Sequence, residues 1–217
     1  MAGVTIRLAI VDDHPMVTGG LAAALATAEG MAVVERGQSF EDAQSLLVRD
    51  DLDVILLDVR LENGNGLQAL AERGPRDRPA VLVISSFRTS QYIAASARYG
   101  AAGFLLKTVP LATLIEAIRA AAAGGSIFTQ DQLQKGFVQL PPRDREILRL
   151  AQDGRSNKEI AGILGVSAKT VESHLTDMYH RFEINGGRIE LTRRAEAEGW
   201  LDIEPPSRAA TEVRTGA

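Results

Sequence analysis

The chain has 217 residues, of which 45% are hydrophobic and 24% are charged, and its formal net charge is −4 at pH 7. This composition is ordinary for a folded protein and excludes a mainly disordered or collagen-like chain, while the absence of cysteine excludes disulfides, thiolate metal sites and cysteine nucleophiles. No apolar run approaches the roughly 20 residues that span a bilayer, and the first residues lack the features of a signal peptide, so we expect a cytoplasmic protein with no membrane partner.

The first half of the chain alternates short apolar runs with segments of helical length. The apolar runs are rich in Val, Ile and Leu and lie at residues 6–11, 31–34, 54–57, 80–84 and 103–106. Runs this continuously apolar are typical of strands buried on both faces. The helical segments lie at 17–28, 40–49, 67–73, 90–99 and 111–123. The alternation predicts an α/β domain over residues 1–123, with a doubly wound, five-stranded parallel sheet whose functional residues gather at the carboxyl ends of the strands.

The alternation stops after residue 123. Residues 124–139 contain a Gly-Gly pair, several glutamines and little periodicity, and we interpret them as a linker. The remaining pattern is helical and predicts a small all-α domain over residues 140–201, with helices that begin near Pro142, Asn157, Ala168 and Arg188. Residues 202–217 hold two prolines and small polar residues, which predicts a disordered tail.

Carboxylates stand at the predicted strand ends. Asp12 and Asp13 follow the first strand, and Asp58 ends the third. Three carboxylates at one sheet edge repel one another unless a cation neutralises them, and oxygen ligands suit Mg²⁺. A carboxylate beside Mg²⁺ can attack phosphorus and form an aspartyl phosphate. Ser85 and Lys107 end the fourth and fifth strands and offer a hydroxyl and a cation for a phosphoryl group.

Each of these residues taken alone has a simpler interpretation. A single Asp at a strand end is more often a helix cap or a turn former, and Asp12 and Asp13 could cap a helix that starts at Pro15. Asp58 has no such explanation inside Leu56-Leu-Asp-Val59. The coincidence of three carboxylates, a hydroxyl and a lysine at four strand ends therefore favours a site.

These segments resemble the receiver domain of bacterial two-component response regulators, which has a flavodoxin-like fold. The resemblance covers residues 5–123 and rests on Ile10-Val-Asp-Asp-His-Pro15, Leu56-Leu-Asp-Val-Arg60, Val83-Ile-Ser-Ser86 and Gly103-Phe-Leu-Leu-Lys107. It implies that a histidine kinase phosphorylates Asp58, and that the receiver catalyses only its own phosphotransfer and dephosphorylation and is otherwise no enzyme. It further implies a set of roles: Mg²⁺ ligands at Asp12, Asp13, Asp58 and the backbone carbonyl of Arg60, a switch hydroxyl at Ser85, a phosphate-binding Lys107 and a switch aromatic at Phe104.

One loop departs from the pattern of this family. After the phosphoacceptor the family commonly has Met-Pro, whereas this chain has Leu61-Glu62-Asn63. That loop flanks the site, so the resemblance leaves room for a different phosphoryl lifetime or a different choice of kinase.

Residues 154–175 predict a helix, a tight turn and a second helix. Gly165 permits a left-handed backbone in the turn, and Ser167 is a good N-cap. Apolar stripes of both helices would face inward, namely Ile160, Ile163 and Leu164 on the first and Val171, Leu175, Met178 and Phe182 on the second. At about 100° per residue, the outward face of the second helix carries Lys169, Thr170, Ser173, Asp177 and His180.

This outward face has two interpretations. In helix-turn-helix proteins, residues near the N-terminus of the second helix touch base edges, which favours Lys169, Thr170 and Ser173 as base readers. The other interpretation is a small helical bundle with a polar, solvated face. Residues 140–200 hold ten basic and ten acidic residues, so no bulk attraction to phosphate decides between them.

Residues 140–200 resemble the LuxR-type helix-turn-helix domain. The matching segments are Arg143-Asp-Arg-Glu-Ile-Leu148, Ser156-Asn-Lys-Glu-Ile-Ala161 and Ser167-Ala-Lys-Thr-Val-Glu-Ser-His174. With a receiver in front, the whole chain is similar to NarL/FixJ-type response regulators. The resemblance implies a homodimer when active, paired partly by the last helix, although the turn before that helix is one residue longer than usual. It also implies contacts to double-stranded DNA through Lys158, Lys169, Thr170, Ser173, His174 and Arg181.

The expected function is therefore a phosphorylation-controlled regulator of transcription that dimerises on DNA. One alternative is a regulator that dimerises constitutively and ignores phosphorylation. Another is an Mg²⁺-dependent phosphohydrolase, which usually needs a nucleophile and a general acid two residues apart. Asp12 and Asp13 are adjacent and position 14 is His, so that spacing is missing.

Overall fold

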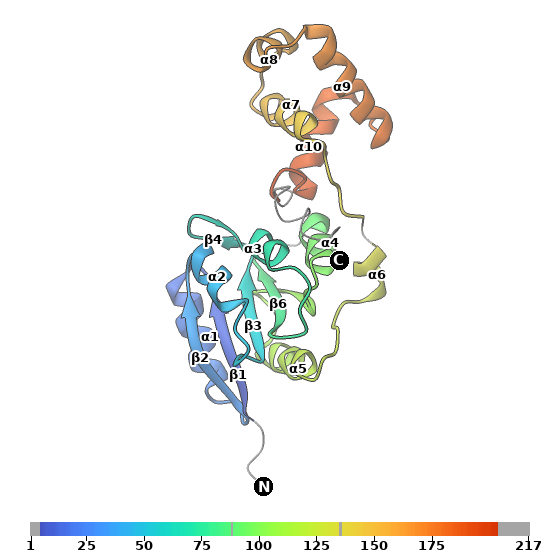
Figure 1. Ribbon diagram of the computed structural model, residues 1–217. Helices are drawn as coiled ribbons and strands as arrows, with labels where there is room; N and C mark the ends of the chain where they lie inside the picture. The colour runs from blue at the N-terminus through green and yellow to red at the C-terminus, as the bar shows by residue number, and fades with distance from the viewer. Residues whose placement is uncertain (1–4, 88, 135, 204–217) are drawn as a thin grey trace, which may run out of the picture. The chain divides into compact units, whose positions relative to one another are not determined.

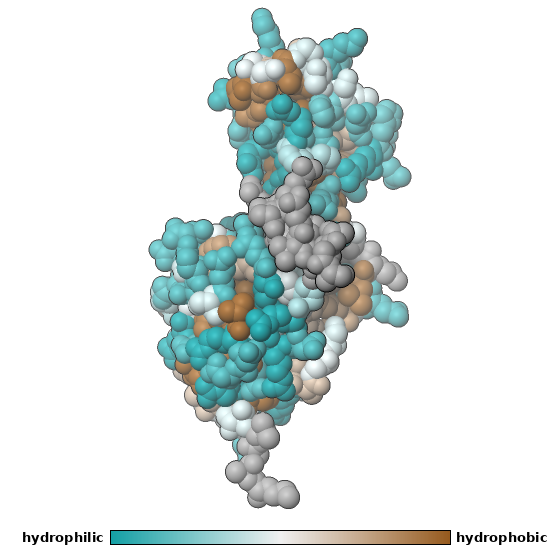
Figure 2. Space-filling view, viewed as in Figure 1, coloured by the Kyte–Doolittle hydropathy of each residue, from teal (hydrophilic) through white to brown (hydrophobic). Residues whose placement is uncertain are grey.

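The computed structural model describes residues 5–87, 89–134 and 136–203 (Figure 1). The chain divides into two compact units, with the boundary between Phe137 and Val138, and the second unit extends to Asp202. Hydrophilic side chains cover most of the visible surface of each unit, and smaller apolar patches are scattered among these side chains (Figure 2). Among the described residues, no helix has the length and apolar character needed to cross a membrane. The predicted disordered tail lies outside the described residues from position 204 onward.

The first unit is built on a five-stranded parallel sheet, as the alternating pattern predicts. Its strands, in the order β2-β1-β3-β6-β7, are Met31–Gly37, Ile6–Val11, Val54–Asp58, Ala80–Ser85 and Gly103–Leu106. Five helices follow the strands: α1 Pro15–Leu25, α2 Phe40–Leu46, α3 Gly66–Arg73, α4 Ser90–Arg98 and α5 Leu111–Ala122. The predicted doubly wound α/β fold is thus confirmed.

Alternate side chains of the central strands enter two separate cores. Leu8, Ile10 and Leu56 pack with α1 and α5 on one face of the sheet. Their neighbours Ala9 and Ile55 pack with α2, α3 and α4 on the other face. Both cores consist largely of fully buried Val, Ile and Leu, which explains why the strands read as continuous apolar runs.

The loop after Asp58 folds into a small hairpin that the sequence pattern does not predict. Two short strands, β4 (Arg60–Leu61) and β5 (Gly64–Asn65), pair antiparallel around Asn63, whose φ is 64°. The backbone of Glu62 also pairs with the segment after β2: its amide donates to the Gln38 carbonyl at 3.1 Å, and its carbonyl accepts from the Phe40 amide at 3.1 Å. Backbone pairing therefore fixes this loop where the family commonly has Met-Pro.

Part of the predicted linker packs against the rest of the first unit, and we call its described residues 126–134 and 136–137 the strap. The Ile127 amide donates to the Ala102 carbonyl at 2.8 Å. Gly103 leaves the space that Ile127 fills, because a Cβ at Gly103 would lie 1.9 Å from Ile127 Cγ1. A short helix, α6 (Gln130–Gln134), packs on α4, and the Phe137 ring meets the Tyr99 ring edge-on at 5.8 Å. The strap thus packs against both β7 and α4.

The second unit is the predicted small all-α unit. Its helices are α7 Pro142–Gln152, α8 Asn157–Leu164, α9 Ala168–Arg181 and α10 Gly187–Glu198. Gly165 ends α8 with a φ of 65°, and Ser167 caps α9 by accepting from the Thr170 amide at 3.0 Å. The core includes Ile160, Val171, Leu175 and Trp200. Ile163, which the apolar stripe places inward, is instead 57% exposed, because α8 buries only a narrow face against its neighbours.

Candidate functional site

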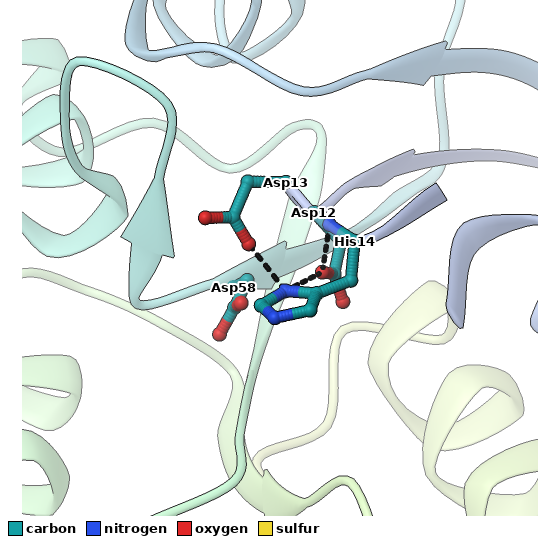
Figure 3. Close-up of side chains that lie close together, drawn as sticks. All are labelled: Asp12, Asp13, His14 and Asp58. Atoms are coloured by element: carbon teal, nitrogen blue, oxygen red, sulfur yellow. Dashed lines mark hydrogen bonds and ion pairs between the residues drawn. The ribbon is translucent and has the colours of Figure 1, made fainter. Parts of the chain in front are cut away.

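Strand register brings the predicted carboxylates together at one edge of the sheet. Val11 pairs with Leu57, so the next residue on each strand, Asp12 and Asp58, comes side by side. Asp12 and Asp58 are buried, whereas Asp13 is partly exposed. Ligand atoms of Asp12, Asp13, His14 and Asp58 all lie within 4.8 Å of one another (Figure 3). The structure therefore gathers three carboxylates and an imidazole at the end of β1 and β3.

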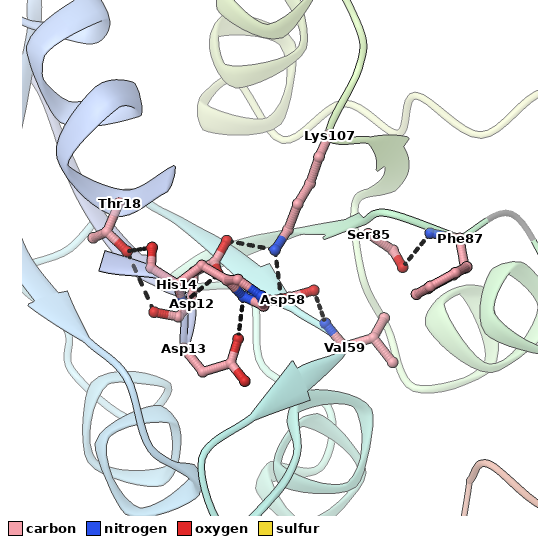
Figure 4. A network of polar contacts seen from close by, with 9 residues as sticks. All are labelled: Asp12, Asp13, His14, Thr18, Asp58, Val59, Ser85, Phe87 and Lys107. Carbon is pink, nitrogen blue, oxygen red and sulfur yellow. Dashed lines mark hydrogen bonds and ion pairs between the residues drawn. The ribbon is translucent and has the colours of Figure 1, made fainter. Parts of the chain in front are cut away.

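Lys107 provides the balancing positive charge. Its Nζ lies 2.7 Å from Asp12 Oδ2 and 2.7 Å from Asp58 Oδ2, with only 11% of the lysine side chain exposed (Figure 4). Burial alone would lower the pKa of Lys107, but its hydrogen bonds with Asp12 and Asp58 outweigh that effect and raise the pKa above its ordinary value. The amino group therefore stays charged and bridges the two buried carboxylates.

Hydrogen bonds hold the Asp58 side chain in place, but its burial makes the ionised form unfavourable. Its Oδ1 accepts from the Val59 amide at 2.7 Å, and its Oδ2 meets Lys107. Burial raises the pKa of Asp58, Lys107 lowers it in part, and the charge of Asp12 raises it again, with a net upward shift. A further positive charge at this edge would stabilise the ionised form.

The other predicted residues lie around this cluster. Ser85 is buried at the end of β6, where its hydroxyl accepts from the Phe87 amide at 3.1 Å. Phe104 is 4% exposed and packs in the core between the sheet and α4. Arg60 is exposed, and its guanidinium carbon lies 4.9 Å from the centre of the Phe87 ring. The Arg60–Phe87 contact joins the loops that follow Asp58 and Ser85.

His14 also belongs to the cluster, although the sequence pattern predicts no role for it. Its Nδ1 lies 2.5 Å from Asp13 Oδ1 and 3.3 Å from Asp12 Oδ1. The signal was present in the sequence, since imidazole is a common metal ligand and His14 directly follows the acidic pair. Three carboxylates with one lysine form an oxygen-rich, net acidic pocket, so the residues present are compatible with Mg²⁺.

The predicted DNA-contacting residues divide into two groups. Lys158 on α8 and Lys169 and Ser173 on α9 are exposed. The others make contacts inside the second unit: Thr170 bonds Ser167 at 2.8 Å, His174 Nδ1 bonds Asp144 Oδ1 at 2.7 Å, and Arg181 donates to the Gln139 carbonyl at 3.1 Å. His174 thereby connects α9 to α7, a role that residue spacing alone does not reveal.

Comparison with known proteins places both units. Residues 8–119 match the response regulator receiver domain family, and residues 138–195 match the bacterial regulatory proteins of the luxR family. The chain is 31% identical over 188 residues to the transcriptional regulatory protein MctR of Rhizobium johnstonii, covering 82% of this chain and 88% of that one. It is 28% identical over 199 residues to the transcriptional regulatory protein DesR of Bacillus subtilis, covering 90% and 99%.

A solved structure agrees with these sequence matches. A LuxR-family two-component response regulator from Aurantimonas sp. SI85-9A1 is 27% identical, with a TM-score of 0.54, covering 60% of this chain and 94% of that one. The resemblance drawn from the motifs is thereby confirmed. The chain belongs to the response regulators that join a receiver domain to a LuxR-type DNA-binding domain, and it is a regulator of transcription.

Proposed function

We propose that phosphorylation of Asp58 by a histidine kinase controls this regulator. The observation that carries the proposal is the placement of the Lys107 ammonium 2.7 Å from the buried carboxylates of both Asp12 and Asp58. The Lys107 ammonium favours the ionised form of Asp58 in a buried site and supplies a cation beside the oxygen that would carry the phosphoryl group.

The transfer step uses the contacts around Asp58. A carboxylate oxygen attacks the phosphorus of a kinase phosphohistidine, so that a P–O bond forms while the P–N bond breaks and its electron pair returns to the imidazole. The Val59 amide holds Oδ1 of Asp58, and the Lys107 ammonium stands ready for a phosphoryl oxygen. Bound Mg²⁺ would neutralise charge on the phosphoryl oxygens, and its ligands would be Asp12, Asp13, Asp58 and the carbonyl of Arg60.

The modified site then differs in charge from the free one. Phosphorylation replaces the single negative charge of the Asp58 carboxylate with a phosphoryl group that carries roughly −1.5 to −2. Lys107 shifts from the carboxylates toward the phosphoryl oxygens, and the Ser85 hydroxyl donates to them. Phe104, three residues before Lys107 on β7, packs beneath α4 and transmits the rearrangement to that helix. The altered surface of the first unit favours a homodimer.

The second unit then binds double-stranded DNA. Lys169 and Ser173 are exposed on the first turns of α9 and contact base edges, and Lys158 holds a phosphate. Thr170, His174 and Arg181 lie on the same helix and make further contacts to the DNA at the edge of the interface. Their polar groups also have partners within the unit. A dimer places two α9 helices on half-sites about one helical turn apart.

Intact mass tests the phosphorylation step. The chain is incubated with acetyl phosphate and Mg²⁺, and we expect one added phosphoryl group, absent in Asp58→Ala. Asp53→Ala is the matched control, and this variant should still be labelled. Asp53 immediately precedes the first residue of β3, at the opposite end from Asp58, and its carboxylate accepts a hydrogen bond from the Arg7 amide at 2.8 Å. No added mass, under conditions that label another receiver, would favour the constitutive regulator instead.

Selection from random duplex DNA tests the binding step. We expect the chain to enrich one duplex sequence with a two-fold arrangement, more strongly after treatment with acetyl phosphate. Enrichment of no sequence with or without the phosphoryl donor would overturn the DNA-binding part of the proposal, independently of the result at Asp58.

A further inference from the structure

The exposed face of α9 carries an acidic residue that neither the fold nor the proposed function uses so far. Val171, Leu175 and Met178 are buried and define the inner face of the helix. At about 100° per residue, Glu172 borders the outward face, next to Ser173 and one turn beyond Lys169. Glu172 is therefore exposed at the edge of the outward face of α9.

Several acidic residues of the second unit have structural partners. Asp144 bonds His174 at 2.7 Å, Glu159 accepts from the Ser156 amide at 2.8 Å, and Glu198 accepts from the Trp200 indole at 2.8 Å. Glu172 is exposed, and among the described residues it has no hydrogen bond or ion pair. Within the described part of the second unit, the carboxylate of Glu172 is thus not used in a polar contact.

An unpaired carboxylate is unfavourable on a helix that enters DNA. Phosphates line both sides of the groove, and this unit has no excess positive charge to compensate, since residues 140–200 hold ten basic and ten acidic residues. The repulsion is offset where the carboxylate accepts a hydrogen bond from a base. A carboxylate at this place therefore selects for a base edge that presents a donor.

Two bases present an amino group in the major groove, and their neighbouring atoms separate them. Cytosine offers the N4 amino group, which is the usual partner of Glu and Asp. Adenine offers its N6 amino group beside the N7 acceptor, which would face the second carboxylate oxygen. The side chain of Glu172 therefore prefers cytosine.

We infer that Glu172 determines specificity by accepting a hydrogen bond from the N4 amino group of a cytosine in each half-site. This inference rests on the proposed DNA binding and adds a base to it. Lys169, one turn earlier on the same side of α9, supplies a nearby positive charge that eases the approach of the carboxylate to the phosphates.

The test compares binding-site selections by the full chain and three variants. The unchanged chain is expected to enrich a cytosine at one position of each half-site. Glu172→Ala should lose that preference, with discrimination falling roughly 5- to 150-fold, and Glu172→Gln should move it toward adenine, which a Gln amide binds through N6 and N7. Asp177→Asn is the matched control, because it removes the same charge from an exposed position five residues along the same helix, and it should keep the cytosine.

The outcomes distinguish a failure of the inference about Glu172 from a failure of the proposed DNA binding. If the unchanged chain and both Glu172 variants enrich the same sequence with the same stringency, the inference is wrong while DNA binding stands. If the unchanged chain enriches nothing, the proposed DNA binding fails, and the inference fails with it. Circular dichroism melting curves for each variant show whether the second unit is folded, which the exposed position of Glu172 leads us to expect.

Discussion

At the scale of a single residue, burial of the Asp58 carboxylate lowers the stability of the folded chain. The Asp58 side chain lies at the end of a fully buried strand, where desolvation raises its pKa and the Lys107 ammonium compensates only in part. An acid with a raised pKa binds its proton more tightly in the folded chain than in the unfolded chain. Stability therefore falls as the pH rises from the ordinary aspartate pKa through the raised value.

Asp58→Asn should reveal this cost. In EDTA at neutral pH, we expect the variant to be more stable than the unchanged chain, because it carries no ionised carboxylate at position 58. The difference should shrink as the pH falls below the ordinary aspartate pKa, where Asp58 is protonated in both states. Urea unfolding across a pH series measures it, and added Mg²⁺ should stabilise the unchanged chain more than the variant. Equal stability at neutral pH would mean that Lys107 offsets the burial completely.

The contact between β7 and the strap shows at the scale of the elements how one glycine decides packing. Gly103 lies in β7, and a Cβ there would lie 1.9 Å from Ile127 Cγ1. Away from such a contact, Gly→Ala in an element interior stabilises by roughly 0.5–1 kcal/mol. The sign of the change at Gly103 therefore tests whether the strap occupies this site in solution.

Gly103→Ala should destabilise the chain by about 1–3 kcal/mol, because Ile127 must move to admit the methyl group. Gly20→Ala is the matched control, since Gly20 is an interior residue of α1 with no atom within 4 Å of its Cβ position, and it should stabilise slightly. Thermal unfolding measures both. A stabilising Gly103→Ala would contradict the packing of the strap.

The second unit offers a similar test between α7 and α9. The 2.7 Å contact between Asp144 Oδ1 and His174 Nδ1 is partly buried. A double-mutant cycle with Asp144→Ala and His174→Ala should give a coupling free energy of about 1 kcal/mol in urea unfolding. We also expect His174→Ala to weaken binding to all duplex sequences alike, because it loosens α9 without removing a base contact. Additive single effects would show that the pair contributes no coupling.

At the scale of the whole molecule, the local pattern of apolar residues predicts the helices and strands. It does not predict features that depend on hydrogen bonds between segments far apart in the sequence. The apolar runs predict all five strands and the edge where Asp12, Asp58 and Lys107 meet, because parallel strands end together. Apolar periodicity does not predict the β4–β5 hairpin, because a strand of two residues is too short to show a period. Backbone hydrogen bonds to Gln38 and Phe40 hold this hairpin in place. Apolar periodicity likewise gives the direction of a buried face and not its width, so Ile163 was placed inward.

The strap also decides where a stable fragment of this chain should end. Composition suggests cutting after residue 123, where the Gly-Gly pair and the glutamines begin. A fragment cut there would leave the Ala102 carbonyl without the Ile127 amide and would uncover the surface that Ile127 and Phe137 protect. The folding unit of the receiver therefore extends beyond the boundary that composition suggests and includes Ile127 and Phe137, so a fragment that ends at residue 137 should be more stable than one that ends at residue 123.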